Sequence, residues 1–155
     1  MPLSEFQPDN YSTLLAAKVE RLREPFSRFT SLEPEIFPSP PSHYRMRAEF
    51  RIKNIDNIPQ YVMFRKDEPK EAHVIKDFNI ACERIAELMQ PLRERLAASE
   101  ALRQRLFQVD FLSGLSGELL VTLIYHRPLD DAWQAEAESV AQQLSIHIIG
   151  RSRKQ

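Results

Sequence analysis

Between residues 45 and 52 the chain alternates strictly between charged and apolar side chains, and this pattern strongly restricts the local fold. The apolar set is Met46, Ala48, Phe50 and Ile52, and the charged set is Arg45, Arg47, Glu49 and Arg51. Successive side chains of a β-strand point to opposite sides, so the segment predicts a strand with one apolar and one charged face. The guanidiniums on the charged face suit phosphates and base edges. The solvated outer face of a half-buried sheet explains the alternation equally well.

The N-terminal half predicts a helix, a connector and three strands. Apolar residues at helical spacing begin at Tyr11, and Pro25 is expected to end that helix. An extended, proline-rich connector without a helix of its own follows. Its prolines are Pro34, Pro38, Pro40 and Pro41. The strand at 45–53 comes next, then a strand at 60–65 and a short one at 72–75.

The C-terminal half predicts two main helices, a hairpin and a last strand. We expect Asn79 to cap a helix that Pro91 kinks or restarts, and Ser99 to cap one further short turn. Strands at 106–112 and 118–126 form a hairpin whose turn contains Gly114 and Gly117. Residues 128–131 open another helix. A strand at 146–149 ends the order, and residues 150–154 leave it.

This order of elements predicts the α+β class. Helices packed on one side of a mostly antiparallel sheet, preceded by an N-terminal helix, are the economical arrangement. We expect two parts: residues 1–41 as the N-terminal helix and connector, and residues 42–155 as the α+β domain.

Bulk composition excludes several classes of protein. The 155 residues include 21 basic and 22 acidic side chains, for a net charge of −1, so any nucleic-acid site must come from local clustering. Cys82 is the single cysteine, which excludes an internal disulfide and favours a small buried thiol over a nucleophile. No long apolar run or signal pattern is present, so we expect no membrane partner and a cytoplasmic location.

The usual motifs of catalysis are missing from these residues. The three glycines form no phosphate-cradling loop, and no serine sits between glycines. The four histidines are far apart in sequence and lack ligand spacing, which predicts no metal site. Read alone, this segment is not an enzyme.

Basic and aromatic residues gather locally instead. Arg45, Arg47, Arg51 and Lys53 lie in the first strand, and Arg151, Arg153 and Lys154 form either a second part of a basic patch or a solvated tail. The hairpin register should place Phe107 and His126 together at the end away from the turn, where flat rings can stack on unpaired bases. A core phenylalanine and a strand-end histidine in water are the alternatives.

The chain resembles the N-terminal part of bacterial tRNA (uracil-5-)-methyltransferases, which make 5-methyluridine in the T-loop. The residues that carry the resemblance are Pro34-Glu35-x-Phe37, the run Ser42 to Ile52, Leu106-Phe107-Gln108-x-Asp110-x-Leu112, Tyr125-His126-x-x-Leu129-Asp130-Asp131-x-Trp133 and Ile149-Gly150-Arg151. The single cysteine and the N-terminal helix favour this tRNA branch over relatives that modify ribosomal RNA.

The resemblance implies a longer enzyme. Its Rossmann-like catalytic domain, absent here, would supply the S-adenosylmethionine site, the nucleophilic cysteine and a carboxylate, so the segment alone is expected to be inactive. The family's contacts with the refolded tRNA T-arm map onto Glu49, Arg51, Phe107 and His126. Arg45 and Arg47 would serve either the phosphate backbone or internal ion pairs.

Two other interpretations stay open. The chain could act as a free-standing RNA-binding or adaptor module without catalysis. It could instead be an interaction fragment whose apolar surface meets the missing catalytic domain in cis, or that self-associates through it.

Overall fold

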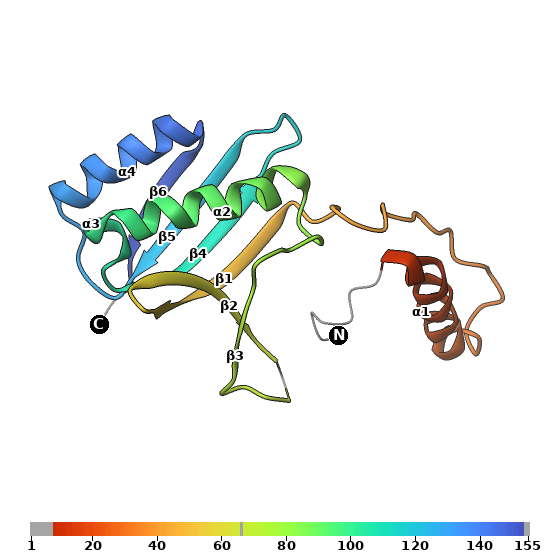
Figure 1. The fold of residues 1–155 in the computed structure, drawn as a ribbon. Helices are drawn as coiled ribbons and strands as arrows, with labels where there is room; N and C mark the ends of the chain where they lie inside the picture. The colour runs from red at the N-terminus through yellow and green to blue at the C-terminus, as the bar shows by residue number, and fades with distance from the viewer. Residues whose placement is uncertain (1–7, 66, 154–155) are drawn as a thin grey trace.

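A single six-stranded sheet organises most of the chain in the computed structural model, which describes residues 8–65 and 67–153 (Figure 1). The strands lie in the order β3-β2-β1-β4-β5-β6. Their bounds are β1 Arg47–Ile55, β2 Ile58–Phe64, β3 Ala72–Val74, β4 Leu106–Ser113, β5 Leu119–Tyr125 and β6 His147–Ser152. The helices are η2 Pro8–Asn10, α1 Tyr11–Phe26, α2 Glu83–Ala98, α3 Glu100–Arg103 and α4 Asp131–Leu144.

Strand pairing confirms the predicted α+β class. Every neighbouring pair is antiparallel except β5 and β6, which run parallel. Parallel neighbours need a crossover connection, and α4 provides it between these two strands. Pairing of β4 with β5 also confirms the hairpin predicted around Gly114 and Gly117.

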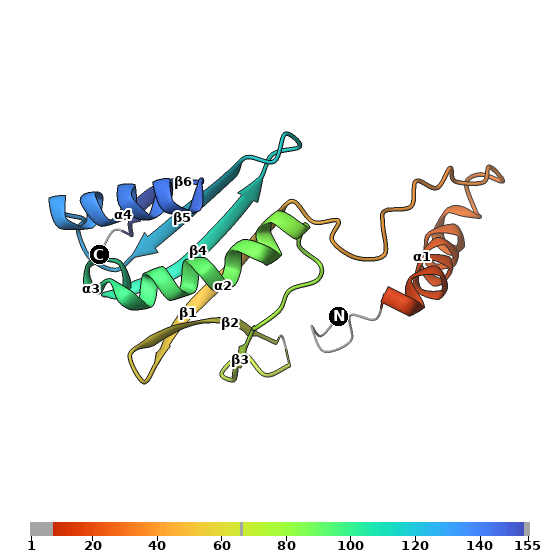
Figure 2. The same cartoon turned by 45° about the horizontal axis from the view of Figure 1, so that its top comes forward.

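In the part of the chain that the structure describes, helices cover only one face of the sheet (Figure 2). Helix α2 packs on β2 and β4, and α4 packs on β6. The apolar members of the alternating strand, including Ala48 and Phe50, are buried on this covered face. Four rings form its centre by tilted and edge-to-face contacts with centroids 5.1–6.0 Å apart: Phe50, Tyr61, Phe78 and Phe111. The opposite face, which we call the open face, carries the charged members of the strand.

The predicted start of the second long helix was wrong. Helix α2 is capped at Cys82 rather than at Asn79. Residues 79–82 instead pair with the chain just before β1: the Arg45 amide donates to the Ile80 carbonyl at 2.9 Å, and the Cys82 amide donates to the Arg45 carbonyl at 2.8 Å. Residues 79 and 80 form a turn, in which the Ala81 amide donates to the Phe78 carbonyl at 3.0 Å, so tertiary pairing overrides the capping preference of asparagine.

Pro91 does not restart α2, which runs as one helix from Glu83 to Ala98. An interior proline costs roughly 3 kcal/mol. Buried apolar side chains on both sides of it, such as Met89 and Leu92, stabilise the helix against that cost. The predicted turn capped by Ser99 is confirmed, because its hydroxyl accepts a hydrogen bond from the Leu102 amide at 3.4 Å.

The last strand is longer than predicted. Residues 147–152 pair with β5, and the Arg153 amide still donates to the Tyr125 carbonyl at 2.8 Å. Gly150 makes this possible, since a Cβ there would lie 2.3 Å from Cη2 of Trp133 on α4. Helix and strand can therefore approach closely only at a glycine. Arg151 and Arg153 thus belong to the sheet edge, while Lys154 lies outside the described residues.

The first helix ends at Phe26, with Pro25 in its last turn, close to the predicted end. A long connector without regular structure joins α1 to β1, as predicted. Both views show α1 standing apart from the sheet (Figures 1 and 2). Among the described residues, no helix is long and apolar enough to cross a membrane.

Candidate nucleic-acid interface

A β-bulge turns Phe107 onto the open face. The register of β4 against β5 shifts between Leu106 and Gln108. Leu106 is buried on the covered face, yet Phe107 and Gln108 both lie on the other side. A bulge adds one residue to a strand and re-aims its side chain. Phe107 is consequently partly exposed rather than a core residue.

Phe107 contacts His126, as the hairpin register predicted, and also Arg51. Its ring lies against the His126 ring with centroids 4.2 Å apart and planes at 63°. The Arg51 guanidinium carbon lies 3.9 Å from the centroid of the same ring. A cation at this distance from an aromatic face is held by the ring's quadrupole. The structure therefore brings Arg51, Phe107 and His126 together at the predicted end of the hairpin.

A second guanidinium, from the end of the edge strand β6, also lies near the Phe107 ring. The carbon at the centre of the Arg153 guanidinium lies 5.0 Å from the Phe107 centroid. Parallel pairing places Arg151 beside Ile124 and carries the chain onward, so that Arg153 reaches the ring. We call Arg51, Phe107, His126 and Arg153 the aromatic–arginine cluster. The sequence alone predicts only that Arg153 belongs to a basic patch or a solvated tail. The position of Arg153 beside Phe107 depends on the length of β6, which was not predicted.

One nitrogen of the cluster has no hydrogen-bond partner. Nη1 of Arg51 is buried and unbonded within the described part of the chain. A buried donor without a partner is costly, typically about 1–3 kcal/mol. Arg51 is thus positioned by its contact with the Phe107 ring, and its buried Nη1 faces no acceptor among the described residues.

A hollow of about 300 Å³ opens beside the cluster. Its walls include Arg47, Glu49, Asp110 and Arg151, together with Phe107 and Arg153. The Gln108 side chain donates to Oδ1 of Asp110 at 2.7 Å, which fixes the orientation of both groups. The hollow therefore combines cationic groups with positioned acceptors. Gln108 and Asp110 belong to the sequence motif that carries the family resemblance, but the sequence alone predicts no role for them.

The remaining predicted residues lie in the first half of β1 or just before it. Glu49 is opposite Asp110 in the register and forms an ion pair with Arg47, so part of the charge of Arg47 is already compensated. This pair is exposed, and such pairs contribute little to stability. Arg45 is exposed just before β1, where its backbone makes the bridge to Ala81. Arg47 is the first residue of β1 and Arg45 precedes it, whereas Arg51 lies at the middle of the strand.

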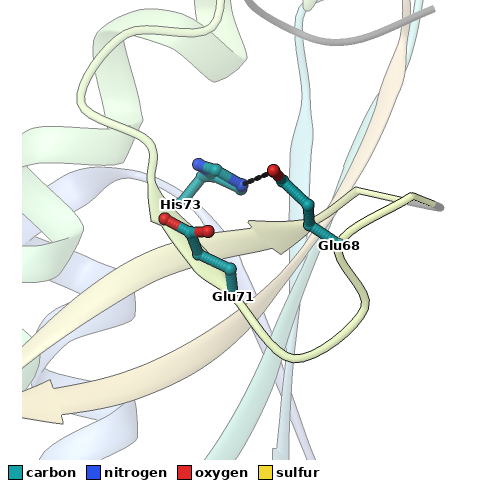
Figure 3. Close-up of side chains that lie close together, drawn as sticks. All are labelled: Glu68, Glu71 and His73. Atoms are coloured by element: carbon teal, nitrogen blue, oxygen red, sulfur yellow. Dashed lines mark ion pairs between the residues drawn. The ribbon is translucent and has the colours of Figure 1, made fainter.

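Within the described residues, a histidine and two carboxylates converge at the connection between β2 and β3 (Figure 3). Ligand atoms of Glu68, Glu71 and His73 lie within 4.8 Å of one another, and Nε2 of His73 is 3.5 Å from Oε2 of Glu68. The Arg65 guanidinium also pairs with Glu68 at 3.7 Å. These side chains form an ion-paired turn that already contains a cation, and the absence of a metal site stays a prediction.

Comparison with known proteins identifies the family. The family model described as tRNA (Uracil-5-)-methyltransferase matches residues 10–155. The chain belongs to this family. Three curated relatives, all named tRNA/tmRNA (uracil-C(5))-methyltransferase, come from Aromatoleum aromaticum (51% identical over 155 residues), Azoarcus sp. (48% over 155) and Chromohalobacter salexigens (50% over 159).

Each of these alignments covers 100% of the chain but only 42% or 43% of the relative. The chain therefore spans less than half the length of the curated relatives that it matches. Helix α1, the connector and the sheet all fall within the matched region.

Proposed function

We propose that this chain is the tRNA-recognition part of a tRNA (uracil-5-)-methyltransferase, corresponding to the N-terminal part of its relatives, and that its aromatic–arginine cluster holds an opened T-loop. The observation that carries the proposal is the position of Phe107, which contacts Arg51, His126 and Arg153 on the face that none of the described helices covers. Rings and guanidinium planes are the groups that stack on splayed bases in single-stranded RNA.

The energetics of base flipping explain why such a cluster is useful. Turning a base out of its stack costs a few kcal/mol. Stacking of a base on an aromatic side chain returns about 1–3 kcal/mol. Phe107 and His126 would supply that stacking, and the partly exposed Arg51 beside them would bind phosphate or a base edge. Glu49 would accept hydrogen bonds from bases, and Arg45 and Arg47 would contact the phosphate backbone along β1.

The chemistry of methyl transfer would come from the rest of such an enzyme. All three glycines are accounted for, because Gly114 and Gly117 form the β4–β5 turn and Gly150 packs on Trp133. The described residues thus offer no glycine-rich loop for S-adenosylmethionine. Cys82 occupies the N-cap position of α2 and packs against the core, which is a structural position. We therefore assign cofactor binding and the nucleophile to the portion that relatives carry beyond this segment, in a cytoplasmic enzyme.

The test is binding of a T-arm stem-loop RNA to the chain. We expect Phe107→Ala combined with His126→Ala to weaken binding tenfold or more, about 1.4 kcal/mol, because stacking is lost. The matched control is Phe64→Ala with His147→Ala, since both side chains are exposed on other strands of the sheet. Fluorescence anisotropy at several salt concentrations measures affinity, which should fall as salt rises because phosphate contacts release counterions.

Equal affinities for the cluster variant and the control variant would show that the hairpin end is only structural. Affinity independent of salt would contradict the arginine contacts with phosphates. Circular dichroism of each variant establishes that the sheet is intact, so a loss of binding can be assigned to the open face.

A further inference from the structure

A second surface remains unexplained by RNA binding, and it lies on α1 and the connector. Phe29, Leu32 and Phe37 are 80%, 83% and 82% exposed, and Leu22 and Phe26 are about half exposed. No residue of α1 is buried. Large, contiguous exposed apolar surfaces usually mark an interaction site. Phe37 also belongs to the Pro34-Glu35-x-Phe37 motif, which the proposed RNA site does not use.

Contacts between α1 and the connector fix the shape of this apolar surface. The connector runs back along α1, because Arg23 forms an ion pair with Glu33 and the Tyr11 hydroxyl lies 3.2 Å from that of Ser39. We call residues 11–39 the N-terminal arm. A hollow of about 560 Å³ between its two limbs is lined by Leu22, Phe26, Leu32 and Pro34. The arm thus presents an apolar socket with Phe29 and Phe37 exposed on the connector.

The arm is not explained by packing within the described chain. Figures 1 and 2 both show it separated from the sheet and its covering helices. Burying one such side chain contributes about 1.5–3 kcal/mol. Several exposed Leu and Phe residues therefore provide enough free energy to hold a domain interface.

We propose that the N-terminal arm docks on the folded portion that the longer relatives carry beyond this segment. The relatives are more than twice as long as the chain, and their match includes the arm, so they contain both the surface and additional chain to cover it. The inference goes beyond RNA recognition, since it uses none of the residues of the open face.

The charges around the arm argue against an anionic membrane as its partner. Residues 20–35 contain three arginines and four glutamates. Binding to anionic lipid requires an excess of Lys and Arg beside the apolar face. An apolar surface with a balanced polar rim instead fits a folded protein domain.

Hydrogen exchange measured by mass spectrometry tests the proposal. This chain is compared alone and joined at Gln155 to the remaining portion of the Aromatoleum relative. We expect amides of α1 to exchange at least about tenfold more slowly in the joined protein, because docking removes local opening. Amides of β4 and β5 should exchange equally in both proteins.

Substitutions then identify the surface responsible. Phe29→Ser with Leu32→Ser should return the exchange of α1 in the joined protein to the rate in the chain alone. Leu115→Ser is the control, because Leu115 is 98% exposed in the β4–β5 turn. All three side chains are largely exposed, so the substitutions leave the packed core intact.

Three results would overturn the proposal. The first is unchanged exchange of α1 on joining. The second is a dimer of the chain alone, seen by sedimentation velocity, that Phe29→Ser with Leu32→Ser abolishes. The third is protection of α1 only by phosphatidylcholine–phosphatidylglycerol vesicles. RNA affinity is not a readout here, so failure of this inference leaves the proposed function intact, and the reverse also holds.

Discussion

Phe50 and Phe107 lie on adjacent strands of one sheet and have opposite surroundings. Phe50 is 1% exposed and contacts three other rings on the covered face. Phe107 is partly exposed on the open face and contacts two guanidiniums and an imidazole. The same type of side chain is therefore packed in the core on one face and presented to solvent on the other. The difference comes from strand position and one bulge, not from residue type.

The largest expected effect is a difference in the free energy of unfolding between alanine substitutions of Phe50 and Phe107. Phe50→Ala should lower the free energy of unfolding by about 3–5 kcal/mol, because it leaves a cavity in a packed core. Phe107→Ala should change it by less than about 1 kcal/mol, since its ring is partly exposed. Urea denaturation followed by circular dichroism measures both. Equal losses for the two variants would mean that the open face is part of the core.

The second expected effect is a loss of stability at high pH that arises from two buried tyrosines on the covered face. Burial raises the pKa of Tyr125 to about 12 from the ordinary 10.0, and burial raises the pKa of Tyr61 as well. The folded protein therefore holds the phenolic proton more tightly than the unfolded chain. The resulting stability is present below pH 10 and is lost as pH rises through about 12, by about 2–3 kcal/mol for Tyr125.

The urea midpoint measured between pH 8 and pH 12 checks this expectation. Tyr125→Phe is the informative variant, because it removes the titrating group along with the hydrogen bond to the Leu102 carbonyl. Its stability at neutral pH should be lower, but its decline above pH 10 should be shallower. A midpoint that stays constant across the range in the unaltered chain would contradict the buried state of these hydroxyls.

The smallest expected effect tests whether Arg153 contributes to RNA binding by the open face. Arg153→Ala should weaken T-arm RNA binding about two- to fivefold, or about 0.5–1 kcal/mol, because one cation beside Phe107 is lost. Arg153→Lys keeps the charge but not the planar group, so it should retain the salt dependence while losing part of the affinity. Arg21→Ala on α1 is the control. If the Arg153→Ala and Arg21→Ala variants bind the RNA with equal affinity, Arg153 does not contribute to RNA binding by the cluster.

Local sequence patterns were sufficient for most of the fold. Alternation from Met46 to Ile52 correctly placed Ala48 and Phe50 in the core. The hairpin register correctly placed Phe107 beside His126, because antiparallel pairing across a short turn relates the two strand ends directly. These predictions depend on residues close in sequence, or joined by one turn.

Features set by distant contacts were not predictable in the same way. Cys82 rather than Asn79 caps α2, because Arg45 pairs with the residues in between. The length of β6 depends on Gly150 fitting under Trp133, which involves two separate elements. The place of Arg153 follows from that length, so a residue of the candidate site was missed along with a strand end. Its role, like that of the other site residues, stays a prediction.

The bulge in β4 has a consequence for how related sequences are compared. Which side of the sheet Phe107 reaches is determined by the number of residues between Leu106 and Val109, one more than regular pleating allows. A homologue could keep an identical phenylalanine at the aligned position and, after a single deletion nearby, direct it into the interior. Chain length at this strand therefore carries information that residue identity alone does not.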